Sequence, residues 1–112
     1  MQIKITHENI EPTDAIREYV EDKISLLTNF QDDLQIADVV VGKTTNHHNK
    51  GEVFHCRVNV SYPGGLYRAD EMHEDLYTAI GASEAVLQRE IIKHKEKLHS
   101  HRDHTDIAET LV

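Results

Sequence analysis

Regularly spaced cations lie near the end of the longest helix that the sequence predicts. Arg89, Lys93 and Lys97 follow one another at intervals of four residues, so on a helix they share one face. Like charges at this spacing repel each other by about 0.2–0.5 kcal/mol per pair, and the phosphates of a nucleic acid would neutralise them. Lys95 and Lys97 also stand where cations stabilise the negative end of a helix dipole. The pattern therefore indicates either a phosphate-binding face or a solvated helix end.

Histidine is the second residue type that could carry chemistry, with nine copies in 112 residues. A metal site on a helix needs imidazoles four residues apart, or an imidazole paired with a carboxylate. The C-terminal histidines do not have that spacing, so the sequence predicts no physiological metal site and no cofactor. Their protonation would add positive charge beside the basic helix end. The residues concerned are His94, His99, His101 and His104, with His47 and His48 adjacent in a polar segment.

The residues that usually carry catalysis form no recognisable set. Cys56 is the single cysteine, which excludes an internal disulfide, and it falls on the apolar face of a predicted strand, where a thiol acts as a small core hydrophobe. The chain contains no glycine-rich phosphate loop, HExxH or GxSxG sequence. Carboxylates are frequent over residues 8–38, but nothing singles out an acid/base pair. An enzyme is therefore the least favoured class.

The elements that position these residues follow from the hydrophobic periodicity. Residues 2–6 alternate as in a half-buried strand, and a helix begins after Thr13, a good N-cap, with Asp14 in its first turn. A second strand is expected over residues 34–44. The apolar face of the helix that begins after Thr13 is predicted to contain Ile16, Val20, Ile24 and Leu27.

The second half of the chain predicts a hairpin and a long helix. Residues 54–62 alternate strictly, a Pro-Gly-Gly turn follows at 63–65, and residues 66–72 return as the partner strand. A helix starts at Glu74 and Asp75 and is expected to end at residue 98 or 101. Its buried face is predicted to comprise Leu76, Ala79, Ile80, Ser83, Val86, Leu87, Ile91 and Leu98.

The predicted order is β-α-β-β-β-α, with two helices covering one face of a four-stranded sheet. This is an α+β two-layer sandwich. A length of 112 residues suffices for one core. We expect a single domain over residues 1–102 and a short acidic tail over residues 103–112.

Charge is distributed unevenly along the chain. Twelve Lys and Arg against twenty Asp and Glu give a formal net charge of −8, which by itself argues against binding to nucleic acid. Residues 1–40 contain three cations and nine anions, whereas residues 88–102 contain five cations and two anions. The cations are therefore concentrated at the end of the second helix. The absence of a signal-peptide pattern and of a run of about 20 apolar residues predicts a soluble, cytoplasmic protein without a membrane partner.

The second helix also carries a family resemblance. Residues 73–80 (HEDLYTAI), Arg89 and residues 93–98 (KHKEKL) closely resemble the ribosome hibernation-promoting factors and the related ribosome-associated translation inhibitor. The N-terminal strand and helix and the hairpin turn are similar as well, so the resemblance extends over about residues 1–99. It implies a fold like that of double-stranded-RNA-binding domains and a function without enzymatic activity.

The resemblance further implies binding in the channel of the small ribosomal subunit where mRNA and tRNA sit, which blocks translation and promotes ribosome hibernation. The implied partners are the small subunit and its rRNA. The chain resembles the short form of the family, so we expect a monomer off the ribosome that acts alone or with a separate ribosome modulation factor. The rRNA-binding residues implied are Arg17 and Lys23 on the first helix and Arg89, Lys93, Lys95 and Lys97 on the second.

Some residues depart from the family pattern. Leu26 and Val86 stand where members often carry Lys, so the basic surface is expected to be thinner. The alternative function is a small protein-interaction or histidine-rich metal-responsive module with the same fold, which the acidic first helix and the nine histidines favour. The sequence of the second helix favours the ribosome-binding function.

Structural roles also remain open for four individual side chains. Arg17 could pair with Glu21 on the first helix, and Lys23 could be solvated. Tyr77 is expected to pack between helix and sheet, and Arg68 to be an exposed cation on the sheet.

Overall fold

A computed structural model describes the backbone of residues 1–45 and 52–111 and the side chains of residues 1–44 and 53–98. The adjacent His47 and His48 lie outside the described residues. The order of elements is β-α-β-β-β-α, with a short 3₁₀ turn after the first helix, so the predicted order is confirmed.

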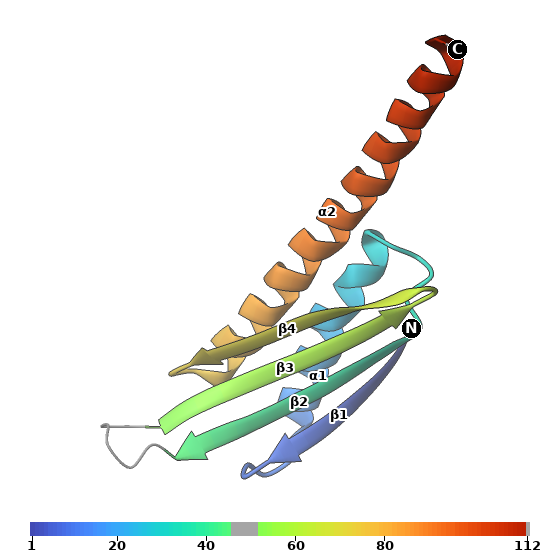
Figure 1. Cartoon of the computed structure of the whole chain (residues 1–112). Helices are drawn as coiled ribbons and strands as arrows, with labels where there is room; N and C mark the ends of the chain where they lie inside the picture. Colours follow the sequence, from blue (N-terminus) through green and yellow to red (C-terminus); the bar gives the residue numbers. More distant parts are fainter. Residues whose placement is uncertain (46–51, 112) are drawn as a thin grey trace.

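The sheet is mixed and its strand order is β1-β2-β3-β4. The strands are β1 (Gln2–Glu8), β2 (Ile36–Thr45), β3 (Glu52–Tyr62) and β4 (Gly65–His73). β1 runs parallel to β2, which requires the crossover that the first helix supplies, and the other neighbours are antiparallel. Both helices lie against the same face of the sheet (Figure 1), so the predicted two-layer α+β arrangement is confirmed.

The first helix, α1 (Asp14–Ser25), begins where the sequence predicts. The Thr13 side chain accepts a hydrogen bond from the Ile16 amide at 3.1 Å, which satisfies one of the unpaired donors at the helix start. A 3₁₀ turn, η1 (Leu26–Asn29), continues the helix. The four predicted apolar residues of this segment are all buried.

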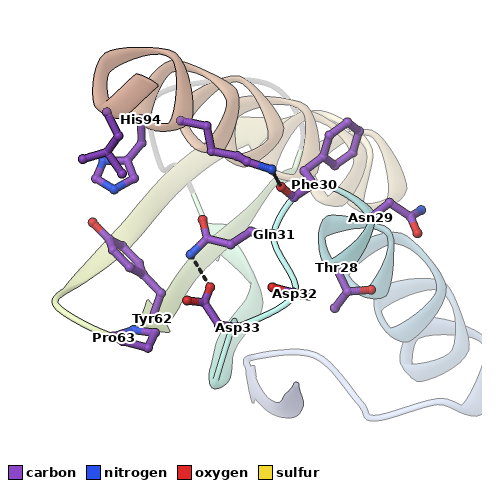
Figure 2. A pocket seen from close by; sticks show the side chains of 11 residues that line it. Thr28, Asn29, Phe30, Gln31, Asp32, Asp33, Tyr62, Pro63 and His94 are labelled. Atoms are coloured by element: carbon purple, nitrogen blue, oxygen red, sulfur yellow. Dashed lines mark hydrogen bonds between the residues drawn. The ribbon is translucent and has the colours of Figure 1, made fainter. Parts of the chain in front are cut away.

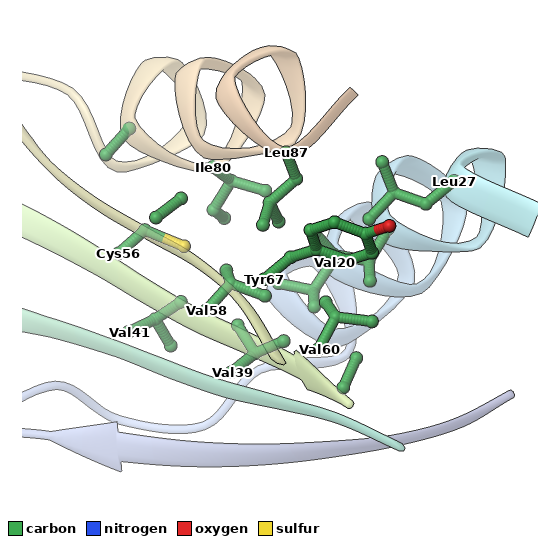
Figure 3. Close-up of a cluster of buried hydrophobic side chains, with 14 of the residues drawn as sticks. Val20, Leu27, Val39, Val41, Cys56, Val58, Val60, Tyr67, Ile80 and Leu87 are labelled. Atoms are coloured by element: carbon green, nitrogen blue, oxygen red, sulfur yellow. The ribbon is translucent and has the colours of Figure 1, made fainter. Parts of the chain in front are cut away.

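The core lies between the two helices and the sheet (Figure 3). Alternate residues of β2 and β3 point into it, as the period of two in these strands predicts. Helix α2 contributes the other side, and its buried residues recur at three- and four-residue intervals. The central side chains are Val20, Leu27, Val39, Val41, Cys56, Val58, Val60, Ile80, Leu87 and Ile91, each at most 1% exposed.

The second helix, α2 (Leu76–Leu111), ends later than predicted. The expected tail from residue 103 continues the helix, because residues 82–112 contain no Gly or Pro to stop it. Leu98, predicted to be buried, is 54% exposed, since the C-terminal part of α2 projects beyond the sheet (Figure 1). Among the described residues, no helix combines the length and apolar character needed to span a membrane.

Candidate nucleic-acid interface

Three exposed cations, which we call the cationic row, follow one another along α2: Arg89, Lys93 and Lys97. Arg89 and Lys93 border one shallow hollow of about 530 Å³, and Lys93 and Lys97 border another of about 590 Å³. Glu90 and Glu96 line the same two hollows, so a phosphate that binds the cationic row also lies close to these carboxylates. Within the described part of the chain, no ion pair engages any of the three cations. Their charges are therefore available to an external anion.

Lys95 is turned away from the cationic row. A step of two residues rotates a side chain by roughly 200° about the helix axis, which directs Lys95 to the side opposite Lys93. Its Nζ donates a hydrogen bond to the backbone carbonyl of Phe30 at 2.5 Å (Figure 2). The ammonium thus fastens α2 to the segment after η1. Its predicted role as a phosphate ligand competes with this internal bond.

The two cations of α1 also have partners within the protein. Arg17 Nη2 lies 3.0 Å from Asp14 Oδ1, so the guanidinium pairs with the preceding turn and not, as the alternative had it, with Glu21. Both side chains are largely exposed, and such a pair contributes little to stability. Lys23 is half-buried, and its Nζ lies 5.7 Å from the centroid of the Tyr19 ring. Lys23 is therefore not simply a solvated cation, because it is half-buried and lies near the Tyr19 ring.

Lys23 belongs to the contact between α1 and α2. Partial burial raises the pKa of Glu84 on α2, and the Lys23 ammonium counteracts that rise. Tyr77 contacts Tyr19 edge to face in the same region, with ring centroids 4.9 Å apart. Tyr77 is 38% exposed and packs on α1, which corrects its expected place between helix and sheet.

Three rings that sequence reasoning did not bring together form an aromatic cluster beside the cationic row: Tyr62, Tyr67 and His94. Tyr62 and Tyr67 stack, with centroids 4.3 Å apart and an interplanar angle of 23°. His94 lies 5.3 Å from Tyr62 and 5.8 Å from Tyr67. The sequence does contain a signal for this cluster. His94 follows the buried Ile91 by three residues, and Tyr62 continues the apolar alternation of its strand, so both rings are expected on the inner side of their elements.

The hairpin turn determines where the Tyr62 ring lies. Gly64 has φ +99°, the left-handed conformation that glycine adopts without strain. A Cβ atom on Gly65 would overlap the Tyr62 hydroxyl, so the absence of a side chain there lets the ring lean across the turn. The Tyr67 hydroxyl donates a hydrogen bond to Gln31 Oε1 at 2.6 Å. Burial raises the pKa of Tyr67 to about 12, so the phenol remains a neutral donor.

Two hollows flank the aromatic cluster, and Tyr62 and His94 line both. The loop hollow, about 500 Å³, lies against residues 28–33 and Pro63. The hairpin hollow is the one of about 590 Å³ that Lys93 and Lys97 border. Figure 2 shows Tyr62 and His94 on one side of the loop hollow, with Thr28 and Asn29 on the other side.

The opposite face of the sheet is held together by polar contacts between strands. His55 Nε2 lies 3.0 Å from Glu8 Oε1 and His55 Nδ1 lies 3.0 Å from Thr44 Oγ1, which leaves the residue only 9% exposed. Arg68 is an exposed cation on this face, as predicted, and donates a hydrogen bond to Asn59 Oδ1 at 3.1 Å. The contacts of His55 join β1, β2 and β3, and the contact of Arg68 joins β3 and β4.

Cys56 is fully buried, and this confirms the core role predicted for it. Burial raises the pKa of its thiol to about 11, so the thiolate that nucleophilic chemistry needs is scarce at neutral pH. Among the described residues, no group of three or more His, Cys, Asp or Glu side chains is placed to hold a metal ion.

Comparison with known proteins identifies the family. The profile of the family described as Sigma 54 modulation protein / S30EA ribosomal protein matches residues 3–99. The chain belongs to this family. The ribosome hibernation promoting factor of Escherichia coli is 35% identical over 101 residues, which cover 90% of this chain and all of that relative. The ribosome hibernation promotion factor of Deinococcus radiodurans is 37% identical over 100 residues, and there the match covers 87% of this chain but only 51% of the relative.

Two solved structures have the same fold. The N-terminal domain of protein Y from Thermus thermophilus is 33% identical and superposes with a TM-score of 0.70, over 84% of this chain and 99% of that one. A ribosomal subunit interface protein from Coxiella burnetii superposes with a TM-score of 0.73 at 21% identity, over 86% of this chain and 99% of that one. The resemblance identified in the sequence is therefore confirmed for both family and fold.

Proposed function

We propose that this chain is a non-enzymatic, cytoplasmic ribosome-binding protein that occupies the mRNA and tRNA channel of the small subunit, inhibits translation and promotes ribosome hibernation. The family match over residues 3–99 carries the proposal. Relatives named ribosome hibernation promoting factor, which the chain matches over most of its length, support it. The exposed cations of α2 fit the function, because structured RNA is recognised mainly through its shape and its phosphates.

The cationic row is the main rRNA contact in this proposal. Arg89, Lys93 and Lys97 project from one face of the same helix, so the backbone that carries them needs no ordering before they meet phosphates. Lys95 and Lys23 have internal partners, and they contribute first to the position of α2 and of α1. Arg17 is exposed and can exchange Asp14 for a phosphate at little cost, since the exposed pair is weak.

The partners follow from the same surface. They are the small subunit and its rRNA, with a separate ribosome modulation factor where ribosomes dimerise. Away from the ribosome the chain is proposed to be a monomer. The net charge of −8 opposes non-specific binding to RNA, so affinity depends on the few cations that are well placed.

Co-sedimentation with ribosomes over a series of salt concentrations tests the proposal. The variant Arg89→Glu/Lys93→Glu/Lys97→Glu is expected to lose binding, and at low salt its residual binding should depend less steeply on salt. Circular dichroism verifies that each variant remains folded.

A matched control changes the net charge by the same amount on the opposite face of the sheet. Lys4→Glu/Arg57→Glu/Arg68→Glu replaces three exposed cations there and is expected to bind like the wild type. A wild type that does not sediment with ribosomes at low salt would contradict the proposal. So would a cationic-row variant that binds as well as the control.

A further inference from the structure

The Tyr62 ring occupies an unusual place at the end of the hairpin. Tyr62 is the last residue of β3 and is only half-buried, whereas its stacking partner Tyr67 is 6% exposed. Tyr67 has a hydrogen-bond partner for its hydroxyl in Gln31. Tyr67 therefore closes the end of the core, and Tyr62 is a second ring placed on its outside.

The Tyr62 ring stacks on one neighbour and borders two hollows. Tyr67 stacks on Tyr62 and lines the hairpin hollow but not the loop hollow. Tyr62 also lines the loop hollow, together with Pro63 (Figure 2). A hollow of about 500 Å³ beside a flat ring and a proline can receive a planar group.

The charges around the ring differ between its two sides. Lys93 and Lys97 border the hairpin hollow together with Glu90 and Glu96, and both lysines are exposed with no ion pair among the described residues. Asp32 and Asp33 border the loop hollow and repel a phosphate, and Lys95, which also lines it, donates to the Phe30 carbonyl. A ligand with an anionic chain and flat neutral groups therefore fits with its charges beside the lysines and a flat group in the loop hollow. RNA has this chemistry.

We propose that Tyr62 stacks on an unpaired base of RNA, with the adjoining phosphates on Lys93 and Lys97. The site rests on the proposed function, because it assumes that RNA reaches the exposed face of α2. Stacking on an aromatic ring accepts any base, since every base has a flat π-face, and it adds to the phosphate contacts without reading the sequence. Tyr62 thus supplies affinity for single-stranded or flipped-out nucleotides that a cationic helix alone does not have.

Two RNA hexamers test the stacking directly. Both carry a dye and are too short to fold, and they differ at one central position, which holds adenine in one and no base in the other. Binding is measured by fluorescence anisotropy at low salt. The wild type is expected to bind the hexamer with adenine roughly 5- to 150-fold more tightly than the abasic one.

The variants separate stacking from packing. Tyr62→Leu retains an apolar side chain against Tyr67 and is expected to bind both hexamers with the affinity that the wild type has for the abasic one. Tyr62→Phe retains the ring and is expected to behave like the wild type. Equal affinity of the wild type for the two hexamers would overturn the proposal. So would a Tyr62→Leu variant, folded by circular dichroism, that still prefers adenine.

Ribosome sedimentation distinguishes this inference from the function on which it rests. If Tyr62→Leu sediments like the wild type while the cationic-row variant does not, the base-stacking site is wrong and the ribosome-binding function stands. If the wild type does not sediment at all, the ribosome-binding function is wrong, and the preference for adenine in the hexamers still decides whether Tyr62 stacks on RNA.

Discussion

Single lysine-to-glutamine substitutions along α2 separate the lysines proposed to bind phosphate from Lys95, which holds the helix to the loop after η1. Lys93→Gln and Lys97→Gln each remove an exposed charge that has no ion-pair partner among the described residues. Lys95→Gln removes a charge whose ammonium donates to the Phe30 carbonyl. All three variants lose one unit of charge and exchange residues of similar helix propensity, so each is a control for the others.

Counterion release sets the magnitude. Each phosphate contact contributes about 0.7 to 0.9 to the slope of log K against log salt concentration. Between 50 and 200 mM salt, one contact therefore accounts for roughly a threefold change in affinity. We expect Lys93→Gln and Lys97→Gln each to reduce the slope by the contribution of one phosphate contact. The double variant should reduce it by the contribution of two. The slope for Lys95→Gln should equal that of the wild type.

Equilibrium binding to purified small subunits at four or more salt concentrations measures these slopes. Lys95→Gln should instead lower the midpoint of thermal unfolding, because the Phe30 carbonyl loses its charged donor. A slope for Lys95→Gln as shallow as that for Lys93→Gln would refute the reasoning. It would mean that the ammonium leaves the carbonyl to bind phosphate and that the position of Lys95 does not limit its role.

Four further predictions concern stability and reactivity. Gly42→Ala should lower the free energy of unfolding by about 1–3 kcal/mol in urea titrations, because its Cβ would lie 2.6 Å from the His55 ring. Gly81→Ala, whose Cβ meets nothing closer than 3.9 Å, should raise it by up to about 1 kcal/mol, and a loss at this position would contradict the packing of the helices. Cys56 should resist alkylation at pH 8 until the protein unfolds, and rapid labelling of the native protein would show that the core opens. The folded-state pKa of Tyr67 is raised to about 12 from 10.0, so its contribution to stability is complete below pH 10 and is lost as the pH rises towards 12. A Tyr67→Phe variant should lack this part of the alkaline transition.

The fold could be predicted from the sequence because its local signals agree. Strict alternation over residues 54–62 and the Pro-Gly-Gly turn specify a hairpin, and the Thr13 cap marks the start of α1. The end of α2 could not be predicted in the same way. No residue there stops a helix, and whether Leu98 is buried depends on how far the sheet extends beneath it.

The candidate site was predicted in part. The spacing of Arg89, Lys93 and Lys97 places them on one exposed face, and the structure agrees. Helical periodicity could not find the partner of Lys95, because the Phe30 carbonyl is 65 residues away in the chain. Nor could it find the stacking of Tyr62, which depends on the missing side chain at Gly65, across the turn.

The hydrogen bond between Lys95 and Phe30 also links the end of α2 to the backbone amides of the neighbouring loop. A ligand on α2 can therefore affect these amides without contacting them. The Phe30 and Gln31 amides donate to the Leu27 carbonyl at 3.0 and 3.2 Å, and both residues are half-buried beside the loop hollow. When α2 moves away, the segment loses its link to the helix and its amides exchange with solvent more readily. A ligand that immobilises α2 should therefore slow deuterium uptake at Phe30 and Gln31. Hydrogen exchange would then report occupancy of the helix through the loop beside it.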